Sequence, residues 1–215
     1  MPAFQTGMDL SFESHAAPLS SPALFAVLDS VLDEHDCEAL IRRVENQSWL
    51  STTWDGSGDA LPRRVSDPDL PCRFVDDDVR PPFASVVDPV LALRLFYRLE
   101  AILPETIGEA QLSGLKPLMR CVHLSAGEAT TTHREPLRAC PDGQISALSF
   151  ILFLNDAFEG GSVEFPGVSR SVDPRAGRVV VFANDLLHTD ALVTAGDRFT
   201  LEGEVFYTQR WRPYR

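Results

Sequence analysis

The sequence has no long hydrophobic run, only a few cysteines, and less positive than negative charge. It never reaches about 18 consecutive apolar residues, which excludes a membrane-spanning helix. Residues 1–19 contain neither a basic region nor an apolar core, so we expect no secretory signal there. The four cysteines form no CxxC pair, which argues against a structural zinc site and is typical of reduced thiols in a cytoplasmic protein.

The charge balance limits the kinds of partner. The chain has 19 Lys and Arg against 31 Asp and Glu, a formal net charge of −12. Such a field repels phosphate backbones and anionic lipid, so we expect no nucleic acid and no membrane as partner. Apolar residues make up 44% of 215 residues, enough for one large folded domain. We expect that domain over 23–215, after a flexible Ser-, Pro- and Ala-rich segment over 1–22.

The first half of the domain carries helix signals. An apolar run at 24–28 predicts a strand, and Asp33 then caps a helix whose apolar positions recur with helical spacing at Cys37, Leu40, Ile41 and Val44. Asp88 and Pro89 start a second helix that runs to about Leu103 and has few charges, so we expect most of its surface to be buried. Residues 49–82 predict a long loop with a short strand near 72–75.

The second half is rich in β-formers. Turn signals separate the runs 118–124, 145–154, 162–165, 178–182 and 199–208. Many short strands favour a sandwich or barrel. The predicted fold class is therefore α+β, with helical support over 23–115 and a β core over 116–210.

The chemistry is concentrated in a few residues of this β half. His133, Glu135 and His188 supply two imidazoles and a carboxylate, the facial triad of non-haem iron(II) oxygenases, which leaves the opposite face of an octahedral ion open. Residues two apart share a strand face, so His133 and Glu135 can reach one ion. Arg198 follows ten residues after His188 and offers a forked cation for a dicarboxylate cosubstrate.

Each of these residues also has a structural interpretation. A lone histidine in a β-run is usually a core residue, but the joint spacing favours ligation for His133 and His188. Glu135 can instead be a solvated carboxylate in a degenerate site, with Asp142 or Asp190 as the substitute ligand. Arg198 can be an ordinary surface arginine of a strand. His15 and His35 are interpreted as structural or idle.

Several motifs in order carry a family resemblance. Gly127 lies six residues before His133, and the run 149–156 ends in Leu154-Asn155-Asp156. The segment 158–166 reads Phe-Glu-Gly-Gly-Ser-Val-Glu-Phe-Pro, and 172–178 reads Val-Asp-Pro-Arg-Ala-Gly-Arg. With the strand and helix expected over 25–44, these motifs resemble the iron(II)/2-oxoglutarate dioxygenase superfamily, specifically its prolyl 4-hydroxylase-like branch, over roughly residues 118–208.

The resemblance implies a double-stranded β-helix, or cupin-like jelly roll, supported by N-terminal helices. It implies iron(II) held by His133, Glu135 and His188, and 2-oxoglutarate paired with Arg198, in an enzyme that releases succinate and carbon dioxide. The chain departs from the family where Glu135 replaces an aspartate and Phe153 a tyrosine. Further cosubstrate contacts are predicted from His123, Ser149 and Thr200.

Substrate contacts are predicted on loops that relatives fold over the iron, at Trp54, Arg63, Arg64 and Arg138, with weaker candidates at Arg120 and Trp211. Three functions remain open. The first is a dioxygenase that uses O2 to hydroxylate an unactivated C–H bond of a small molecule or amino-acid-like substrate. The second is a peptidyl or protein prolyl hydroxylase, and the third is a non-catalytic cupin-like binding protein with a degenerate metal site.

Overall fold

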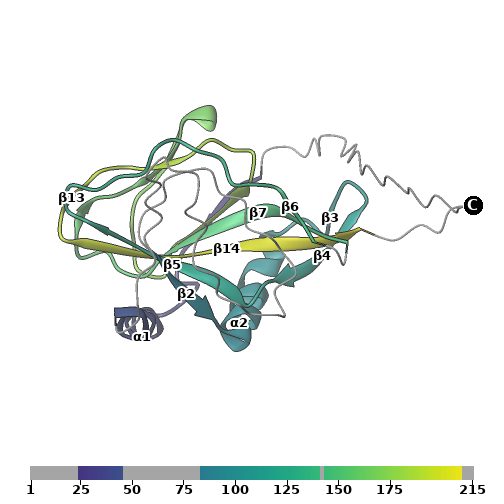
Figure 1. Ribbon diagram of the computed structural model, residues 1–215, viewed down its shortest axis with the longest axis horizontal. Coiled ribbons are helices and arrows are strands. Elements are labelled where there is room, and N and C mark those ends of the chain that lie inside the picture. Colours follow the sequence, from purple (N-terminus) through teal and green to yellow (C-terminus); the bar gives the residue numbers. More distant parts are fainter. Residues whose placement is uncertain (1–23, 46–82, 141–142, 210–215) are drawn as a thin grey trace, which may run out of the picture.

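Most of the described chain is antiparallel strand. The computed structural model describes residues 24–45, 83–140 and 143–209 (Figure 1). Its helices are α1 (Glu34–Glu45) and α2 (Pro89–Leu99), with short 3-10 turns at Glu100–Ile102 and Pro166–Val168. Its strands are β1 (Phe25–Leu28), β2 (Phe83–Val87), β3 (Thr106–Ile107), β4 (Ala110–Leu115), β5 (Leu118–Ser125), β6 (Arg138–Ala139), β7 (Gln144–Phe153), β8 (Glu159–Gly160), β9 (Val163–Phe165), β10 (Arg170–Val172), β11 (Val179–Ala183), β12 (Thr189–Asp190), β13 (Val193–Ala195) and β14 (Asp197–Gln209).

Both helices begin at the predicted caps. The Asp33 carboxylate accepts a hydrogen bond from the Asp36 amide at 2.8 Å, and the Asp88 carboxylate accepts one from the Leu91 amide at 2.9 Å. Each cap satisfies an amide that has no partner inside the helix. Pro89 stands at the start of α2, where its missing amide costs nothing.

The strands build one large sheet and two small ones. The large sheet has the order β1-β11-β7-β14-β4-β3, with β5 and β2 added beside β14 and β6 beside β7. Strand β14 lies in the middle of this sheet and links its parts, because it pairs with β7 along one edge and with β5 and then β4 along the other. The small sheets, β10-β9-β12 and β13-β8, close the other side. The predicted jelly roll is thus confirmed.

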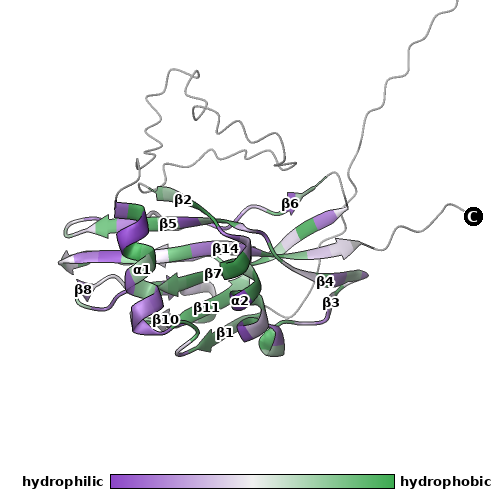
Figure 2. Ribbon diagram, turned by 90° about the horizontal axis from the view of Figure 1, so that it is seen from below, coloured by the Kyte–Doolittle hydropathy of each residue, from purple (hydrophilic) through white to green (hydrophobic). Residues whose placement is uncertain are grey.

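The large sheet has one face toward the helices and one toward the inside of the roll. Figure 2 shows α1 and α2 lying across the same face. On β7, Phe150 and Leu152 pack in the cluster that includes the helices, whereas Ile151 and Phe153 pack with the small sheets. This alternation follows from the two-residue period of a strand. It also means that a side chain on the inner face of β14 points toward the site described below.

Three strands that the sequence did not predict, β2, β3 and β4, lie within residues 23–115, the part expected to give helical support. Strand β2 pairs with β5, and β4 pairs with β14, so both extend the large sheet. The run at 83–87 buries only Ala84 and Val86, and so few apolar residues give a weak sequence signal. The prediction of helical support over residues 23–115 is corrected accordingly, because this part also adds strands to the large sheet.

The surface of α2 also corrects a prediction. Leu91, Leu95 and Leu99 pack into the core, but Leu93 is 54% and Tyr97 62% exposed. Few charges therefore do not make this helix buried all round, because only one stripe of it meets the sheet.

The cysteines divide into two kinds. Cys37 and Cys121 are buried free thiols, as predicted, and burial raises the pKa of Cys121 to about 12. Cys140 is disulfide-bonded, which corrects the prediction that all the cysteines are reduced. Spacing along the chain does not show which loops lie close enough to be bridged, and that proximity decides whether a disulfide forms.

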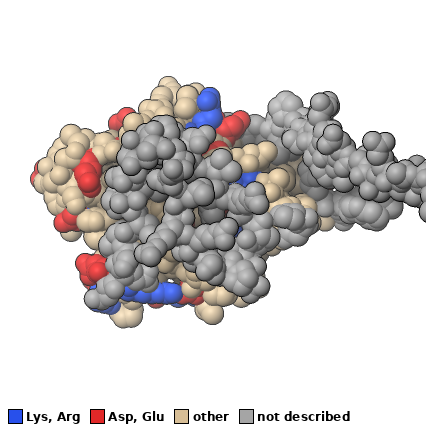
Figure 3. All heavy atoms as spheres, in the orientation of Figure 1, with Lys and Arg blue, Asp and Glu red and all other residues tan. Residues whose placement is uncertain are grey.

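Within the described ranges, neither helix has the length and apolar character needed to cross a bilayer. On the face of the molecule shown in Figure 3, the described acidic and basic side chains are scattered and do not gather into one large patch of either charge.

Candidate metal centre and cosubstrate site

The backbone brings the two histidines together from distant parts of the chain. His133 and His188 form an isolated antiparallel bridge, in which each amide donates to the other residue's carbonyl at 2.9 Å. The Glu135 amide then donates to the Asn184 carbonyl at 3.0 Å. The segment after β5 and the segment between β11 and β12 are thereby locked side by side, with the predicted ligands on them.

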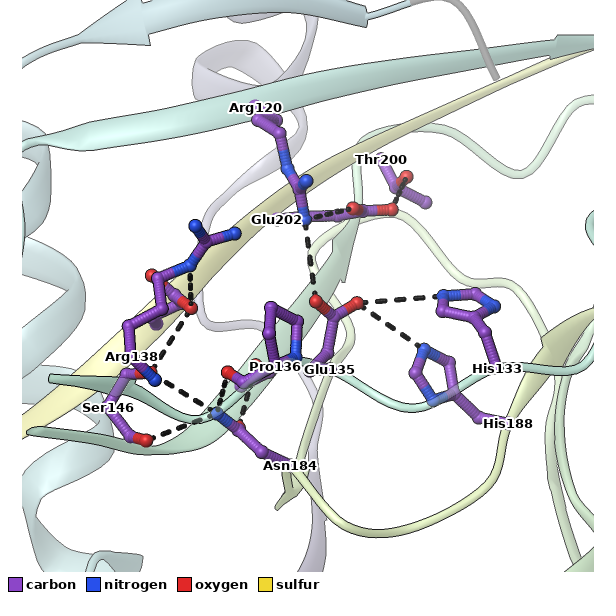
Figure 4. A network of polar contacts seen from close by, with 12 residues as sticks. Arg120, His133, Glu135, Pro136, Arg138, Ser146, Asn184, His188, Thr200 and Glu202 are labelled. Carbon is purple, nitrogen blue, oxygen red and sulfur yellow. Dashed lines mark hydrogen bonds and ion pairs between the residues drawn. The ribbon is translucent and has the colours of Figure 1, made fainter. Parts of the chain in front are cut away.

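The three side chains converge. The Oε1 atom of Glu135 lies 3.6 Å from the Nε2 atom of His133 and 3.7 Å from that of His188 (Figure 4). Donor atoms about 2.1 Å from an ion lie about 3 Å apart when they occupy adjacent octahedral positions. The two distances of 3.6 and 3.7 Å exceed this separation by about 0.6–0.7 Å, a gap that small side-chain rotations can close, so the two imidazoles and one carboxylate fit an iron(II) ion.

Hydrogen bonds orient both imidazoles. The Nδ1 atom of His133 is 2.8 Å from the Thr131 carbonyl oxygen, and that of His188 is 3.2 Å from the Leu186 carbonyl oxygen. A carbonyl only accepts, so Nδ1 carries the proton and the lone pair of Nε2 faces the centre. Burial lowers the pKa of His188, and the neighbouring His133 lowers it further, which favours the neutral form that binds a metal.

Arg198 is buried on the inner face of β14. It is 1% exposed, and its Nη2 atom donates to the Asp190 carboxylate at 2.7 Å. Its Nε and Nη1 atoms are buried and meet no hydrogen-bond partner among the described residues. A buried donor without a partner is costly, so these two nitrogens mark a place for an acceptor such as a carboxylate.

The predicted Gly-Gly turn forms one wall beside Arg198. Gly161 has φ of +66°, and a Cβ atom built there would lie 3.1 Å from the Arg198 Cδ atom and 2.9 Å from the Phe158 ring. A larger residue would crowd the arginine stem. The close approach gives a physical reason for glycine at this position.

The other predicted cosubstrate residues are placed unequally. Thr200 is 1% exposed and lies two residues from Arg198 on the same inner face of β14. Ser149, on the neighbouring strand β7, is also buried, but its hydroxyl donates to the Asn184 side chain at 2.9 Å. His123 lies on the opposite face, where its Nε2 atom is 2.8 Å from Asp197. The structure therefore does not bring His123 to Arg198.

The register explains the displacement of His123. Arg198 is paired with Leu124, while His123 is paired with Phe199 and stacks on its ring at 4.5 Å. A shift of one residue moves a side chain to the other face of a strand. Leu124, not His123, thus faces the buried arginine.

The remaining candidates divide between described and undescribed parts. Arg138 is buried, and its Nε atom pairs with Glu204 at 2.8 Å. Asp190 pairs with Arg198 and does not belong to the group of His133, Glu135 and His188, whose donor atoms lie within 4.8 Å of one another. Five predicted residues lie outside the described part of the chain: Trp54, Arg63, Arg64, Asp142 and Trp211.

Sequence reasoning missed the polar network beside Glu135. Asn184 is 3% exposed, and its side-chain amide donates to the Pro136 carbonyl at 3.1 Å, which fixes the segment that follows Glu135 (Figure 4). Glu202 and Glu204 extend the polar inner face of β14, and burial raises the pKa of Glu204 although Arg138 acts against it. Alternate polar residues from Arg198 to Glu204, within an otherwise apolar strand, were the available signal.

Comparison with known proteins gives a partial match in sequence. No family model matches the chain. A PKHD-type hydroxylase from Hyphomonas neptunium is 33% identical over 114 residues, which cover 49% of this chain and 50% of that protein. This chain thus spans about half the length of the curated relative.

Solved structures share the fold over most of the chain. A viral collagen prolyl hydroxylase from Paramecium Bursaria Chlorella virus-1 has a TM-score of 0.58 at 12% identity and covers 86% of this chain and 95% of that one. A Pseudomonas putida prolyl-4-hydroxylase has a TM-score of 0.57 at 16% identity, and the match covers 87% of this chain and 93% of that one. A 2OG-Fe(II) oxygenase family protein from Burkholderia pseudomallei has a TM-score of 0.53 at 13% identity, and the match covers 87% of this chain and 89% of that one.

The partial sequence match and the shared fold agree with the motifs. The resemblance to the iron(II)/2-oxoglutarate dioxygenase superfamily, and within it to the prolyl 4-hydroxylase-like branch, is confirmed.

Proposed function

We propose that this chain is an iron(II)- and 2-oxoglutarate-dependent dioxygenase that hydroxylates an unactivated C–H bond. The observation that carries the proposal is the convergence of His133, Glu135 and His188 in one fold with the buried Arg198, whose Nε and Nη1 atoms meet no acceptor among the described residues. Bound iron(II) and 2-oxoglutarate would supply the activation of O2 and the attack on the C–H bond, with succinate and carbon dioxide as products.

The protein residues have separate tasks in this proposal. His133, Glu135 and His188 hold the metal on one face, and the carbonyls bonded to the imidazoles keep Nε2 aimed at it. Arg198 receives the far carboxylate of the cosubstrate through Nε and Nη1 while Asp190 holds Nη2. Thr200 supplies a hydroxyl on the same face.

The apolar inner cluster excludes water from part of the site. Phe165 and Phe182 pack against the His188 ring, with centroids 5.7 and 4.6 Å from it. The Arg198 guanidinium lies over the Phe153 ring, with its Cζ atom 5.3 Å from the ring centroid. A low local dielectric strengthens the attraction between Arg198 and an incoming carboxylate.

For the substrate we propose a small molecule or an amino-acid-like compound. Arg120, Arg138, Glu202 and Glu204 place charges of both signs on the inner surface near Glu135, which suits a polar substrate better than an apolar one. Arg138 is a candidate contact, and Trp54, Arg63 and Arg64 remain candidates outside the described residues.

A peptidyl or protein prolyl hydroxylase is the second candidate. It is favoured by the prolyl hydroxylases among the structures of similar fold, one of which was solved with a peptide fragment of hypoxia inducible factor. Succinate release under air, measured with a panel of free amino acids and of proline peptides, separates the two. Release that needs a proline peptide supports the second candidate and contradicts the first.

The non-catalytic alternative has its own test. A cupin-like binding protein with a degenerate site would not form a ternary complex with iron(II) and 2-oxoglutarate. Succinate release that depends on added iron and is lost in His188→Ala contradicts it. If the purified protein binds neither iron nor 2-oxoglutarate, the proposed dioxygenase activity is wrong.

A further inference from the structure

We propose that Arg120 is a positioning residue that makes Glu135 a ligand through one oxygen only. The inference rests on the proposed function and deepens it, because it assigns a role to a residue outside the metal-ligand group. It also explains how a glutamate at this position can bind the metal like the aspartate of the prolyl 4-hydroxylase-like proteins, although its side chain is one methylene longer.

The two oxygens of Glu135 face different partners. Oε1 points to the imidazoles, 3.6 and 3.7 Å from their Nε2 atoms, whereas Oε2 lies 3.7 Å from the Nη2 atom of Arg120 (Figure 4). The carboxylate is therefore divided between the metal position and the guanidinium. A cation beside Oε2 competes with a metal for that oxygen and leaves Oε1 as the ligand.

Arg120 is itself held in place from its other side. It lies on β5 directly opposite Glu202 on β14, and its Nη2 atom is 3.6 Å from the Glu202 carboxylate. The side chains of Arg120, Glu202 and Glu135 are 18%, 14% and 7% exposed. Because water screens these charges little, their attraction exceeds that of a surface pair. The two strands thus aim the guanidinium at Glu135.

The longer ligand makes this restraint useful. Glutamate has one more rotatable bond than aspartate, so without a partner its carboxylate can turn and bind a metal through both oxygens. The second oxygen would then occupy part of the open face that a facial triad leaves for cosubstrate and O2. By holding Oε2, Arg120 keeps that face open and reduces the conformational freedom that Glu135 loses on binding.

The test is metal affinity, measured with Co(II) as the probe by titration calorimetry on the full chain. Removal of a residue that orients a metal ligand typically costs 10- to 100-fold in affinity. We expect Arg120→Gln to weaken Co(II) binding by about 10-fold or more and Arg120→Lys to restore part of it. Arg138→Gln is the matched control, since it removes the same charge from the neighbouring pair with Glu204, and we expect a change of less than about twofold.

A double-mutant cycle with Glu135→Asp makes the test specific. The shorter aspartate cannot reach Arg120, which is already 3.7 Å from the glutamate oxygen. Arg120→Gln should therefore have less than about a twofold effect on Co(II) affinity in the Glu135→Asp background. An equal effect in both backgrounds overturns the inference, as does a Co(II) affinity in Arg120→Gln equal to that of the wild type. Equal weakening by Arg138→Gln overturns it too, because general charge would then be the cause.

The outcomes separate this inference from the proposed function. If wild-type protein binds Co(II), His188→Ala does not, and Arg120→Gln still binds normally, only the role of Arg120 is wrong. If wild-type protein does not bind Co(II) at these residues, the metal site itself is wrong. Should Arg120→Gln fail to fold, Arg120→Met combined with Glu202→Gln removes a cation and an anion together. The same loss of Co(II) affinity is expected, and its absence overturns the inference.

Discussion

Replacement of Arg198 gives the strongest test of the cosubstrate site. In Arg198→Lys the positive charge remains, but a compact ammonium replaces the planar guanidinium that bonds Asp190 through Nη2 and leaves Nε and Nη1 for a ligand. The lysine cannot serve both carboxylates with the same geometry. We therefore expect the variant to fold and to bind 2-oxoglutarate more weakly.

The magnitude follows from the hydrogen bonds that lysine cannot make to the cosubstrate. A hydrogen bond to a charged group contributes about 1.5–3 kcal/mol, so the loss of one such bond weakens the affinity by about 10- to 150-fold. At a cosubstrate concentration of about 100 times the wild-type Kd, binding stabilises the wild type by about 2.7 kcal/mol. A variant with a Kd weaker by about 100-fold gains only about 0.4 kcal/mol.

Thermal unfolding with and without 2-oxoglutarate, in the presence of an inert divalent metal, measures this difference. For a chain of this size about 1 kcal/mol shifts the Tm by about 2–4 °C, so the wild type should gain about 5–10 °C and the variant about 1 °C. Leucine at both Arg198 and Asp190 is the control for the buried pair, since a well-packed apolar replacement is often neutral for stability. It should keep the apo Tm and lose the ligand shift. Equal shifts in Arg198→Lys and the wild type would refute the assignment.

Three further predictions concern stability and reactivity. Asp88→Ala should cost about 1 kcal/mol in urea unfolding at pH 7, because Asp88 caps α2. The bond to the Leu91 amide, and then Arg43, lower the pKa of Asp88 below 3.8, so this stabilisation is present above about pH 3.8 and is lost as pH falls through the lowered value. A difference from wild type that persists unchanged at pH 2 contradicts this cause. Asn184→Ala should cost about 1–3 kcal/mol in the same assay, since it removes a buried side chain whose amide donates to the part-buried Pro136 carbonyl; a loss below about 0.5 kcal/mol argues against it. Iodoacetamide at pH 8 should modify Cys121 more than about 100-fold faster in urea than in the native protein, because burial raises its pKa to about 12; similar rates would show that the thiol is accessible.

The fold and the centre of the site were accessible from the sequence because their signals are local or depend on order along the chain. The helix caps at Asp33 and Asp88 are short-range chemistry, and the structure has both. The spacing of His133, Glu135, His188 and Arg198 identified residues that the structure brings into one region. Order and spacing sufficed here, since the jelly roll fixes which strand ends meet.

The details that failed depend on register and on tertiary partners. His123 was placed one residue from the position that faces Arg198, and a strand converts an error of one residue into the opposite face. The sequence offered Arg120 only as a weaker candidate for substrate contact, because its place opposite Glu202 and near Glu135 cannot be inferred from its sequence neighbours. Strands β2 and β4 are short and form against partners distant in sequence, so local patterns predicted neither.

Anaerobic titration of the protein with iron(II) and 2-oxoglutarate tests the central claim most directly. The arrangement of His133, Glu135 and His188 around one ion, with Arg198 for the cosubstrate, predicts a metal-to-ligand charge-transfer absorption in the visible that saturates at one equivalent of iron per chain. The same titration of His188→Ala should show no such band. Absence of the band in the wild type, or a band of equal strength in His188→Ala, would contradict the account.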